Sequence, residues 1–221
     1  MAASSSQSET DSPKQARKMA RDDRRVNEGF APKMKRTLGR IPFAREAAAA
    51  YRQSIAETPT MAAHLNLGIT LLNAADLTSA EKALASGLAQ SRKRQDLALT
   101  AAFLGNIGNV YANQNNLSRS LAAFRDARAI YQKLPRPIGE AESLGNIGMV
   151  YFLRSELDSA QTALKDALKI NREIDYPRGQ AQDLDRLGTV YILRGELDSA
   201  LTSYQAALDI NRKIGYRNGE G

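Results

Sequence analysis

The sequence predicts an all-α protein built as a solenoid of stacked, antiparallel helix pairs, and two observations lead to this prediction. The first is composition: 43 % of the 221 residues are hydrophobic, but only 6 % are aromatic and tryptophan is absent, so alanine and leucine must fill the core. Both are strong helix formers. The second observation is an internal period of 40 residues, because repetition at such a spacing indicates stacked supersecondary units.

Matching residues recur at intervals of 40 from residue 67 onward. The clearest column consists of Leu67-Gly68, Ile107-Gly108, Ile147-Gly148 and Leu187-Gly188. Further columns are Tyr111, Tyr151 and Tyr191; Ala80, Ser120, Ala160 and Ala200; and Leu84, Phe124, Leu164 and Tyr204. Composition alone does not produce so many matches at one offset. We therefore expect four repeat units, at 61–100, 101–140, 141–180 and 181–220.

Each unit is expected to hold two helices, A and B. In the second unit the helix A residues Leu104, Ile107, Gly108 and Tyr111 are spaced i, i+3, i+4 and i+7, which is typical of a helix with one buried face. A polar break precedes each helix B. In the third and fourth units these breaks read Glu-Leu-Asp-Ser, at 156–159 and 196–199, and are predicted to supply Asp or Ser as the N-cap of helix B.

The recurring glycines lie inside helix A, where glycine costs about 0.8–1.0 kcal/mol relative to alanine. The small residues Ala80, Ser120, Ala160 and Ala200 follow twelve positions later, on helix B. We expect a close crossing of the two helix backbones within each unit to account for both columns.

The paired Leu-Gly and Tyr of helix A, with Ala and a large apolar residue on helix B, resemble the tetratricopeptide repeat over residues 61–220. The common repeat is about 34 residues long. The 40-residue unit is similar to the branch found in cell-polarity adaptors and some bacterial signalling proteins, and its six additional residues are expected to lengthen helix B and the loop after it. The resemblance implies a right-handed superhelix with the A helices along its concave face.

Two segments precede the repeats. Residues 43–60 resemble a degenerate helix B that caps the array. Residues 1–42 are expected to be a basic, disordered arm, since residues 1–45 hold 11 Lys and Arg against 5 Asp and Glu. The arm could also contact an anionic membrane or nucleic acid through its charge.

Signatures of catalysis are scarce, so we expect no enzyme, no cofactor and no metal site. Cysteine is absent, and the single histidine, His64, is expected to be a partly exposed polar residue. Asp183 and Asp185 lie two apart on a helix and should point to different sides. Without a secretory signal or a run of about 18 apolar residues, a cytoplasmic protein is expected; an organelle transit peptide fits poorly with the early acidic residues.

A peptide-binding groove is the leading functional prediction. Asn66, Asn106 and Asn146 form one column on helix A, which Arg186 continues. The resemblance implies a ladder of amides along the concave face that grips an extended peptide backbone; the alternative is that each amide satisfies the seam between units. Further candidates for the groove are Asn109, Asn113, Phe152, Arg154, Thr189, Ile192 and Arg194. The arginines in the last two units point to an acidic ligand or a C-terminal carboxylate.

The last unit carries the alternative prediction. A terminal unit without a polar cap exposes its stacking face, and here that face is expected to include Leu201, Tyr204, Leu208 and Ile210. Either the chain is a fragment of a longer array or copies associate through this face, so a self-assembling structural protein is the second functional class.

Overall fold

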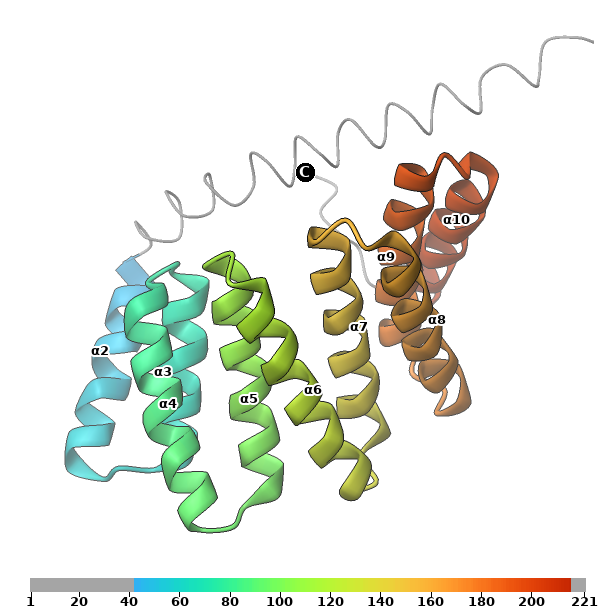
Figure 1. Ribbon diagram of the computed structural model, residues 1–221. Coiled ribbons are helices and arrows are strands. Elements are labelled where there is room, and N and C mark those ends of the chain that lie inside the picture. The colour runs from blue at the N-terminus through green and yellow to red at the C-terminus, as the bar shows by residue number, and fades with distance from the viewer. Residues whose placement is uncertain (1–41, 216–221) are drawn as a thin grey trace, which may run out of the picture.

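The computed structural model describes residues 42–215, which fold into a row of helices packed one after another (Figure 1). These helices are α2 (Pro42–Glu57), α3 (Met61–Asn73), α4 (Leu77–Lys93), α5 (Leu97–Asn113), α6 (Leu117–Lys133), α7 (Pro137–Leu153), α8 (Leu157–Glu173), α9 (Pro177–Arg194) and α10 (Leu197–Lys213). Within the described range no strand is present, and consecutive helices pack as pairs. The predicted all-α solenoid is confirmed.

The helices follow a half-period of 20 residues inside the 40-residue repeat. From α4 onward, helices begin at residues 77, 97, 117, 137, 157, 177 and 197. Helices α5 to α8 are 17 residues each, and the turns after A and B helices have the same three-residue length in these units. In these units helix B and the loop after it are thus no longer than helix A and its loop, whereas in the first unit α4 has 17 residues and α3 has 13.

A left-handed residue recurs in the turns between helices. Positive φ angles of 50–62° occur at Ala75, Gln95, Asn115, Ser155 and Asp175, and Gly195 has a φ of 77°. The next residue is the N-cap in every case. Asp76, Asp96 and Asn116 accept a hydrogen bond from the backbone N–H three residues later.

The N-caps of α8 and α10 differ from the prediction. Glu156 and Glu196 occupy these positions, and neither side chain makes a capping hydrogen bond. Asp158 and Asp198 instead lie in the first helical turn, where a carboxylate is favoured by the partial positive charge of the helix N-terminus.

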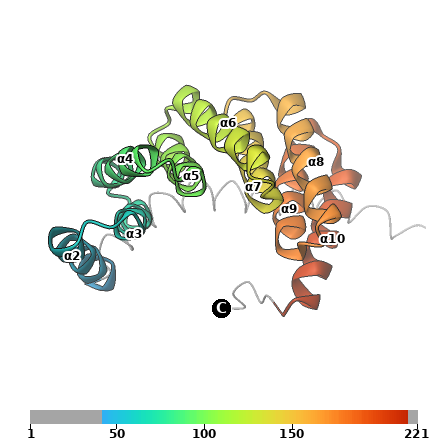
Figure 2. The same ribbon diagram turned by 90° about the horizontal axis from the view of Figure 1, so that it is seen from below.

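The array curves into an arch with two helical layers. Figure 2 shows α3, α5, α7 and α9 on the inner side and α4, α6 and α8 on the outer side. Helix α2 stands at one end of the described array and α10 at the other. The A helices thus line the concave face, and they touch one another directly, α3 against α5 and α7 against α9.

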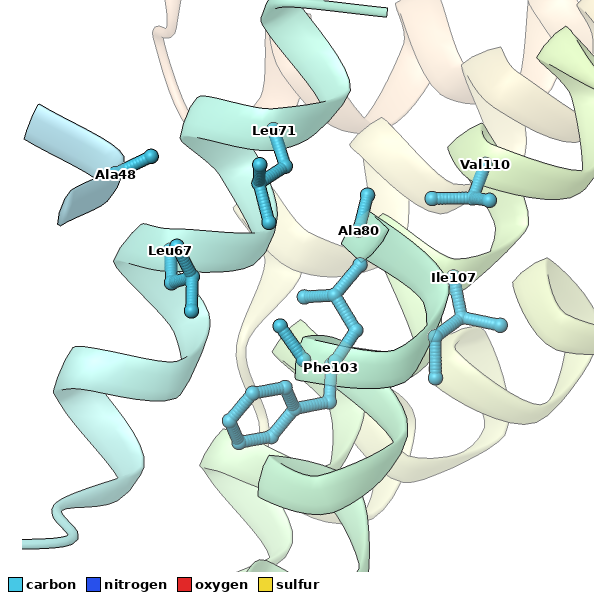
Figure 3. Close-up of a cluster of buried hydrophobic side chains, with 9 residues drawn as sticks. Ala48, Leu67, Leu71, Ala80, Phe103, Ile107 and Val110 are labelled. Carbon is cyan, nitrogen blue, oxygen red and sulfur yellow. The ribbon is translucent and has the colours of Figure 1, made fainter. Parts of the chain in front are cut away.

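The core is a chain of small clusters rather than one centre. Figure 3 shows the first cluster, in which Ala48 of α2, Leu67 and Leu71 of α3 and Phe103 of α5 are buried around α4. Helix α2 therefore packs on the first unit. The described residues do not include 1–41, which are almost the whole of the predicted basic arm. They also do not include 216–221, where the fourth predicted unit ends.

The repeated glycines make room for the large apolar residue of helix B. A Cβ atom added to Gly108 would lie 2.7 Å from the Phe124 ring, and one added to Gly148 would lie 2.7 Å from Leu164 Cγ. The Ser120 hydroxyl also donates a hydrogen bond of 2.9 Å to the Gly108 carbonyl. Large and small residues of helix B thus both contact the glycine, whereas the sequence argument considered only the small ones.

Candidate inner-face site

The predicted asparagine column lies on the inner helices, but its members differ in their contacts. Asn66 of α3 is exposed. Asn106 of α5 is half-buried and donates to the Ala102 carbonyl of its own helix at 2.9 Å. Asn146 of α7 accepts a 3.3 Å hydrogen bond from Arg186 of α9. The column therefore combines an exposed amide, one bonded within its helix and one bonded across the seam between units.

Two more of the predicted asparagines lie on the inner helix α5: Asn109, which is half-buried, and Asn113. Asn113 is exposed and its side chain donates to the Asn109 carbonyl at 2.9 Å. Because Asn113 lies seven residues after Asn106, the two share one helix face. This face of α5 presents amides with donors and acceptors at helical spacing.

The three predicted arginines are paired with carboxylates of the chain. Arg186 lies 3.7 Å from Asp183, and Arg154 lies 3.0 Å from Glu156. Arg194 pairs with Glu196 at 2.6 Å and also with Asp158. Their positive charge is thus largely balanced within the protein.

Exposed leucines on the inner helices are absent from the predicted set. Leu153 of α7 is 52 % exposed and Leu193 of α9 is 39 % exposed, beside the predicted, half-buried Phe152 and Ile192. Each leucine lies seven residues after the asparagine-column member of its helix, so both continue the same face. Their separation of 40 residues was the signal that could have found them.

Thr189 and Tyr204 bond to each other. Their hydroxyl oxygens are 3.0 Å apart, and Thr189 also donates to the Asp185 carbonyl. The Tyr204 ring fills the space beside Gly188, where an added Cβ would lie 2.8 Å from it. Tyr204 therefore packs within its own unit.

A buried polar network joins the third and fourth units. Asp183 of α9 is only 3 % exposed, accepts a 2.8 Å hydrogen bond from Asn171 of α8 and faces Arg186. Burial raises the pKa of Asp183 to about 6, although Arg186 and Asn171 oppose the shift. Burial likewise raises the pKa of Glu142 and lowers that of Arg186. Asp183 is buried and Asp185 is half-buried, so the two side chains do differ in their surroundings. The sequence analysis did not predict that Asp183 would be buried.

His64 is buried, which contradicts the expectation of partial exposure. It is 6 % exposed, and its Nδ1 lies 2.8 Å from the Thr60 carbonyl at the start of α3. The histidine is held in the packing of the first unit.

The predicted self-association residues differ in their exposure to solvent. Leu201 and Leu208 of α10 are 38 % and 43 % exposed, as is Ile214 just beyond it, at 41 %. Ile210 is half-buried against the cluster formed with α9. Self-association itself stays a prediction.

Two hollows involve residues outside the predicted set. A groove of about 470 Å³ runs over α6, α7 and α8, and Arg125 donates to the Tyr151 hydroxyl there at 2.7 Å. A more apolar hollow of about 540 Å³ lies near the α6–α7 turn, beside Tyr131, Ile138 and Ile174. Between residues 42 and 215 no group of His, Cys, Asp and Glu is arranged to hold a metal ion, and none of the helices is long and apolar enough to cross a membrane.

The stacked helix pairs, with the A helices along the concave face, make this a helical-repeat protein. Proteins of this class present an extended concave surface. The sequence profile described as Tetratricopeptide repeat matches residues 99–173 and 139–213. The chain belongs to the tetratricopeptide repeat family. No curated protein matches it at a significant level.

Solved structures share this fold at low sequence identity. BtubC from P. vanneervenii superposes with a TM-score of 0.69 at 18 % identity, covering 96 % of this chain and 91 % of BtubC. A putative kinesin light chain from Podosopora anserina with nearly identical TPR-like repeats gives 0.64 at 14 %, covering 86 % and 96 %. MamA from Desulfovibrio magneticus RS-1 gives 0.54 at 16 %, covering 95 % and 98 %. These likenesses concern the fold.

Proposed function

We propose that this chain is a cytoplasmic, non-catalytic scaffold whose inner face holds an extended peptide segment of another protein. The tetratricopeptide repeat fold generally mediates protein–protein interaction or assembly. The observation that carries the proposal is the pair of exposed leucines, Leu153 and Leu193, at equivalent positions on two helices that touch.

The inner face combines two chemistries along its length. On α5 the amides of Asn106 and Asn113 can exchange hydrogen bonds with a peptide backbone whatever its side chains. On α7 and α9 the leucines, flanked by Phe152 and Ile192, can bury an apolar side chain. Full burial of one leucine contributes about 1.5–3 kcal/mol. The two chemistries together favour a peptide with an apolar anchor rather than a purely charged one.

The arginines do not add an acidic preference to this proposal. Arg154, Arg186 and Arg194 already face carboxylates of the chain. A ligand carboxylate would have to displace these partners, which offsets most of the attraction. The acidic ligand predicted from the sequence therefore finds no support in the charges around these residues.

A peptide selection tests the proposal directly. Peptides selected from a random library on the whole chain should bind at least tenfold more weakly to Leu153→Glu and to Asn106→Ala, with the helical circular dichroism signal unchanged. Leu97→Glu is the matched control, since Leu97 is 46 % exposed at the start of α5, a turn or more from the amides. Peptides that bind all three variants as they bind the parent chain would refute the inner-face site.

A further inference from the structure

One edge of the arch carries an excess of positive charge. It is the edge at which α4 turns into α5 and α6 turns into α7, and Figure 1 shows both turns at the lower side of the array. Five cationic side chains are exposed there: Arg92, Lys93, Arg94, Lys133 and Arg136. Within the described residues none of the five forms an ion pair. We call these five residues the basic edge.

The carboxylates near these turns interact with other groups of the chain. Asp96 caps α5 by accepting a 2.9 Å hydrogen bond from the Leu99 N–H, and Glu140 lies 3.3 Å from Arg128. Glu142 interacts electrostatically with arginines of α9. The charge of the basic edge is therefore largely available to a partner.

Helix stability explains only part of this charge. Arg92, Lys93 and Lys133 lie in the last turns of α4 and α6, where a cation is favoured by the partial negative charge of the helix C-terminus. Arg136, however, is the N-cap residue of α7 and lies beside the positive end of that helix. Its side chain makes no capping hydrogen bond, so a cation at this position does not stabilise α7.

The equivalent turn of the next unit lacks the excess. Residues 92–98 and 132–138 each carry a net charge of +2, whereas residues 172–178, between α8 and α9, carry none. There Arg172 and Arg178 are accompanied by Glu173 and Asp175. The positive charge is thus a property of these two turns and not of the repeat.

Two exposed aliphatic side chains lie among the cations. Leu97 is the first residue of α5 and Ile138 is the second residue of α7, and each is 46 % exposed. Ile138 also borders the apolar hollow of about 540 Å³, whose lining includes Ile174 at the end of α8. A purely ionic ligand would leave these apolar groups in water.

This combination matches the surface of an anionic membrane. Lipid headgroups attract the cations, and aliphatic side chains gain by entering the boundary between headgroups and acyl chains. A nucleic acid matches less well, because bases stack on exposed aromatic rings and the tyrosine at these turns, Tyr131, is half-buried. A peptide held in the hollow would reach only Arg136 among the five cations, whereas a membrane meets both turns at once.

We propose that the basic edge, together with Leu97 and Ile138, docks this protein on a membrane surface that contains anionic lipids. The contact is peripheral and uses the ends of inner and outer helices alike. It leaves the concave face open to a peptide, so this site is independent of the proposed peptide groove.

Vesicle flotation with the whole chain tests the proposal. Binding to vesicles of phosphatidylcholine and phosphatidylserine should exceed binding to phosphatidylcholine alone at least tenfold, and should weaken with added salt. The double variant Lys133→Glu, Arg136→Glu should lower this binding at least tenfold. The matched control is Lys82→Glu, Lys165→Glu, which changes the net charge equally at exposed residues two or more turns before the ends of α4 and α8. It should stay within threefold of the parent chain.

A second pair of variants tests the apolar contact. Ile138→Ser should weaken binding to the anionic vesicles at least threefold, because the aliphatic group no longer enters the membrane. Leu153→Ser, the same kind of change at the other end of α7, should leave it unchanged. The helical circular dichroism signal should be that of the parent chain in every variant.

Three outcomes would overturn the proposal. Equal binding to neutral and anionic vesicles, or no binding to either, would exclude an anionic membrane as the partner. Equal losses in the two double variants would show that the overall charge, including that of the predicted basic arm, drives binding. An unaffected Ile138→Ser variant, with duplex DNA bound as tightly as the vesicles, would show a general polyanion surface instead. Peptide binding to the inner face should persist in Lys133→Glu, Arg136→Glu, so failure of one site is distinguishable from failure of the other.

Discussion

The seam between the first two units and the seam between the last two have similar helical frames but opposite chemistry. At the α4–α5 seam the Phe103 ring is fully buried beside Gly87, and the hydroxyls of Ser91 and Thr100 complete the contact. At the α8–α9 seam Asn171 and Asp183 form a buried hydrogen bond, and Arg186 reaches back to α7. Different side chains can thus form the contact between units, provided that a glycine lies opposite the large side chain. Gly87 lies opposite Phe103, and Gly179 lies opposite Asn171.

The difference has consequences for stability. The α4–α5 seam depends mainly on apolar burial, which changes little with pH. The α8–α9 seam contains a carboxyl whose charged form is poorly solvated, so its contribution depends on protonation. Three substitutions test this contrast, in order of expected effect.

Phe103→Ala should produce the largest loss of stability. Removing a fully buried phenylalanine leaves a cavity and costs about 3–5 kcal/mol. Urea unfolding monitored by circular dichroism measures the change. Phe152→Ala is the control, and a smaller loss is expected because Phe152 is only half-buried. Equal losses in the two variants would show that the α4–α5 seam does not rest on Phe103.

Asp183→Asn should remove a pH dependence from the α8–α9 seam. The pKa of Asp183 is raised from 3.8 to about 6, so between these values the folded chain binds a proton that the unfolded chain has released. Its contribution to the free energy of unfolding therefore falls as pH rises from about 4 to 6, by at most about 3 kcal/mol, and is constant above that window.

The measurement is the difference in free energy of unfolding between the parent chain and Asp183→Asn at pH 4, 5, 6 and 7. We expect this difference to fall with rising pH and then level off. A difference that stays constant or rises with pH would contradict the raised pKa.

Gly179→Ala should destabilise the α8–α9 seam more modestly. Its new Cβ would lie 2.6 Å from the Asn171 amide, and overpacking of this kind costs about 1–3 kcal/mol. The matched control is Gly105→Ala, because a Cβ added there would meet no atom of another helix within 4 Å. Alanine in place of that helical glycine should raise the free energy of unfolding by about 0.8–1.0 kcal/mol. Opposite signs in thermal or urea unfolding are the expected result, and a shared sign would be evidence against the seam argument.

The period and the helix pairs were predictable because they depend on local sequence. Columns such as Ile107-Gly108 and Tyr111 recur at the same place in successive units, and the profile matches lie within 99–213, where these columns occur. For the inner-face residues, the sequence predicted the positions in the repeat but not the hydrogen-bond partners. Asn106 and Asn146 occupy equivalent places, but one bonds to its own helix and the other to Arg186.

Other features required neighbours that are distant in sequence. The burial of His64 and Asp183 and the ion pair between Arg194 and Asp158 cannot be derived from spacing along one helix. Leu168 and Leu208 occupy the same place in the repeat, yet one is covered by α9 and the other is largely exposed.

The sequence by itself determined the helices, their 40-residue register and the order of the units, since helix-forming composition and periodic apolar faces act over a few turns. Tertiary structure decided which polar groups are satisfied and which apolar faces stay exposed. The physical reason is that burial and electrostatic pairing depend on what lies opposite a side chain, and in this array that is set by the adjacent helix.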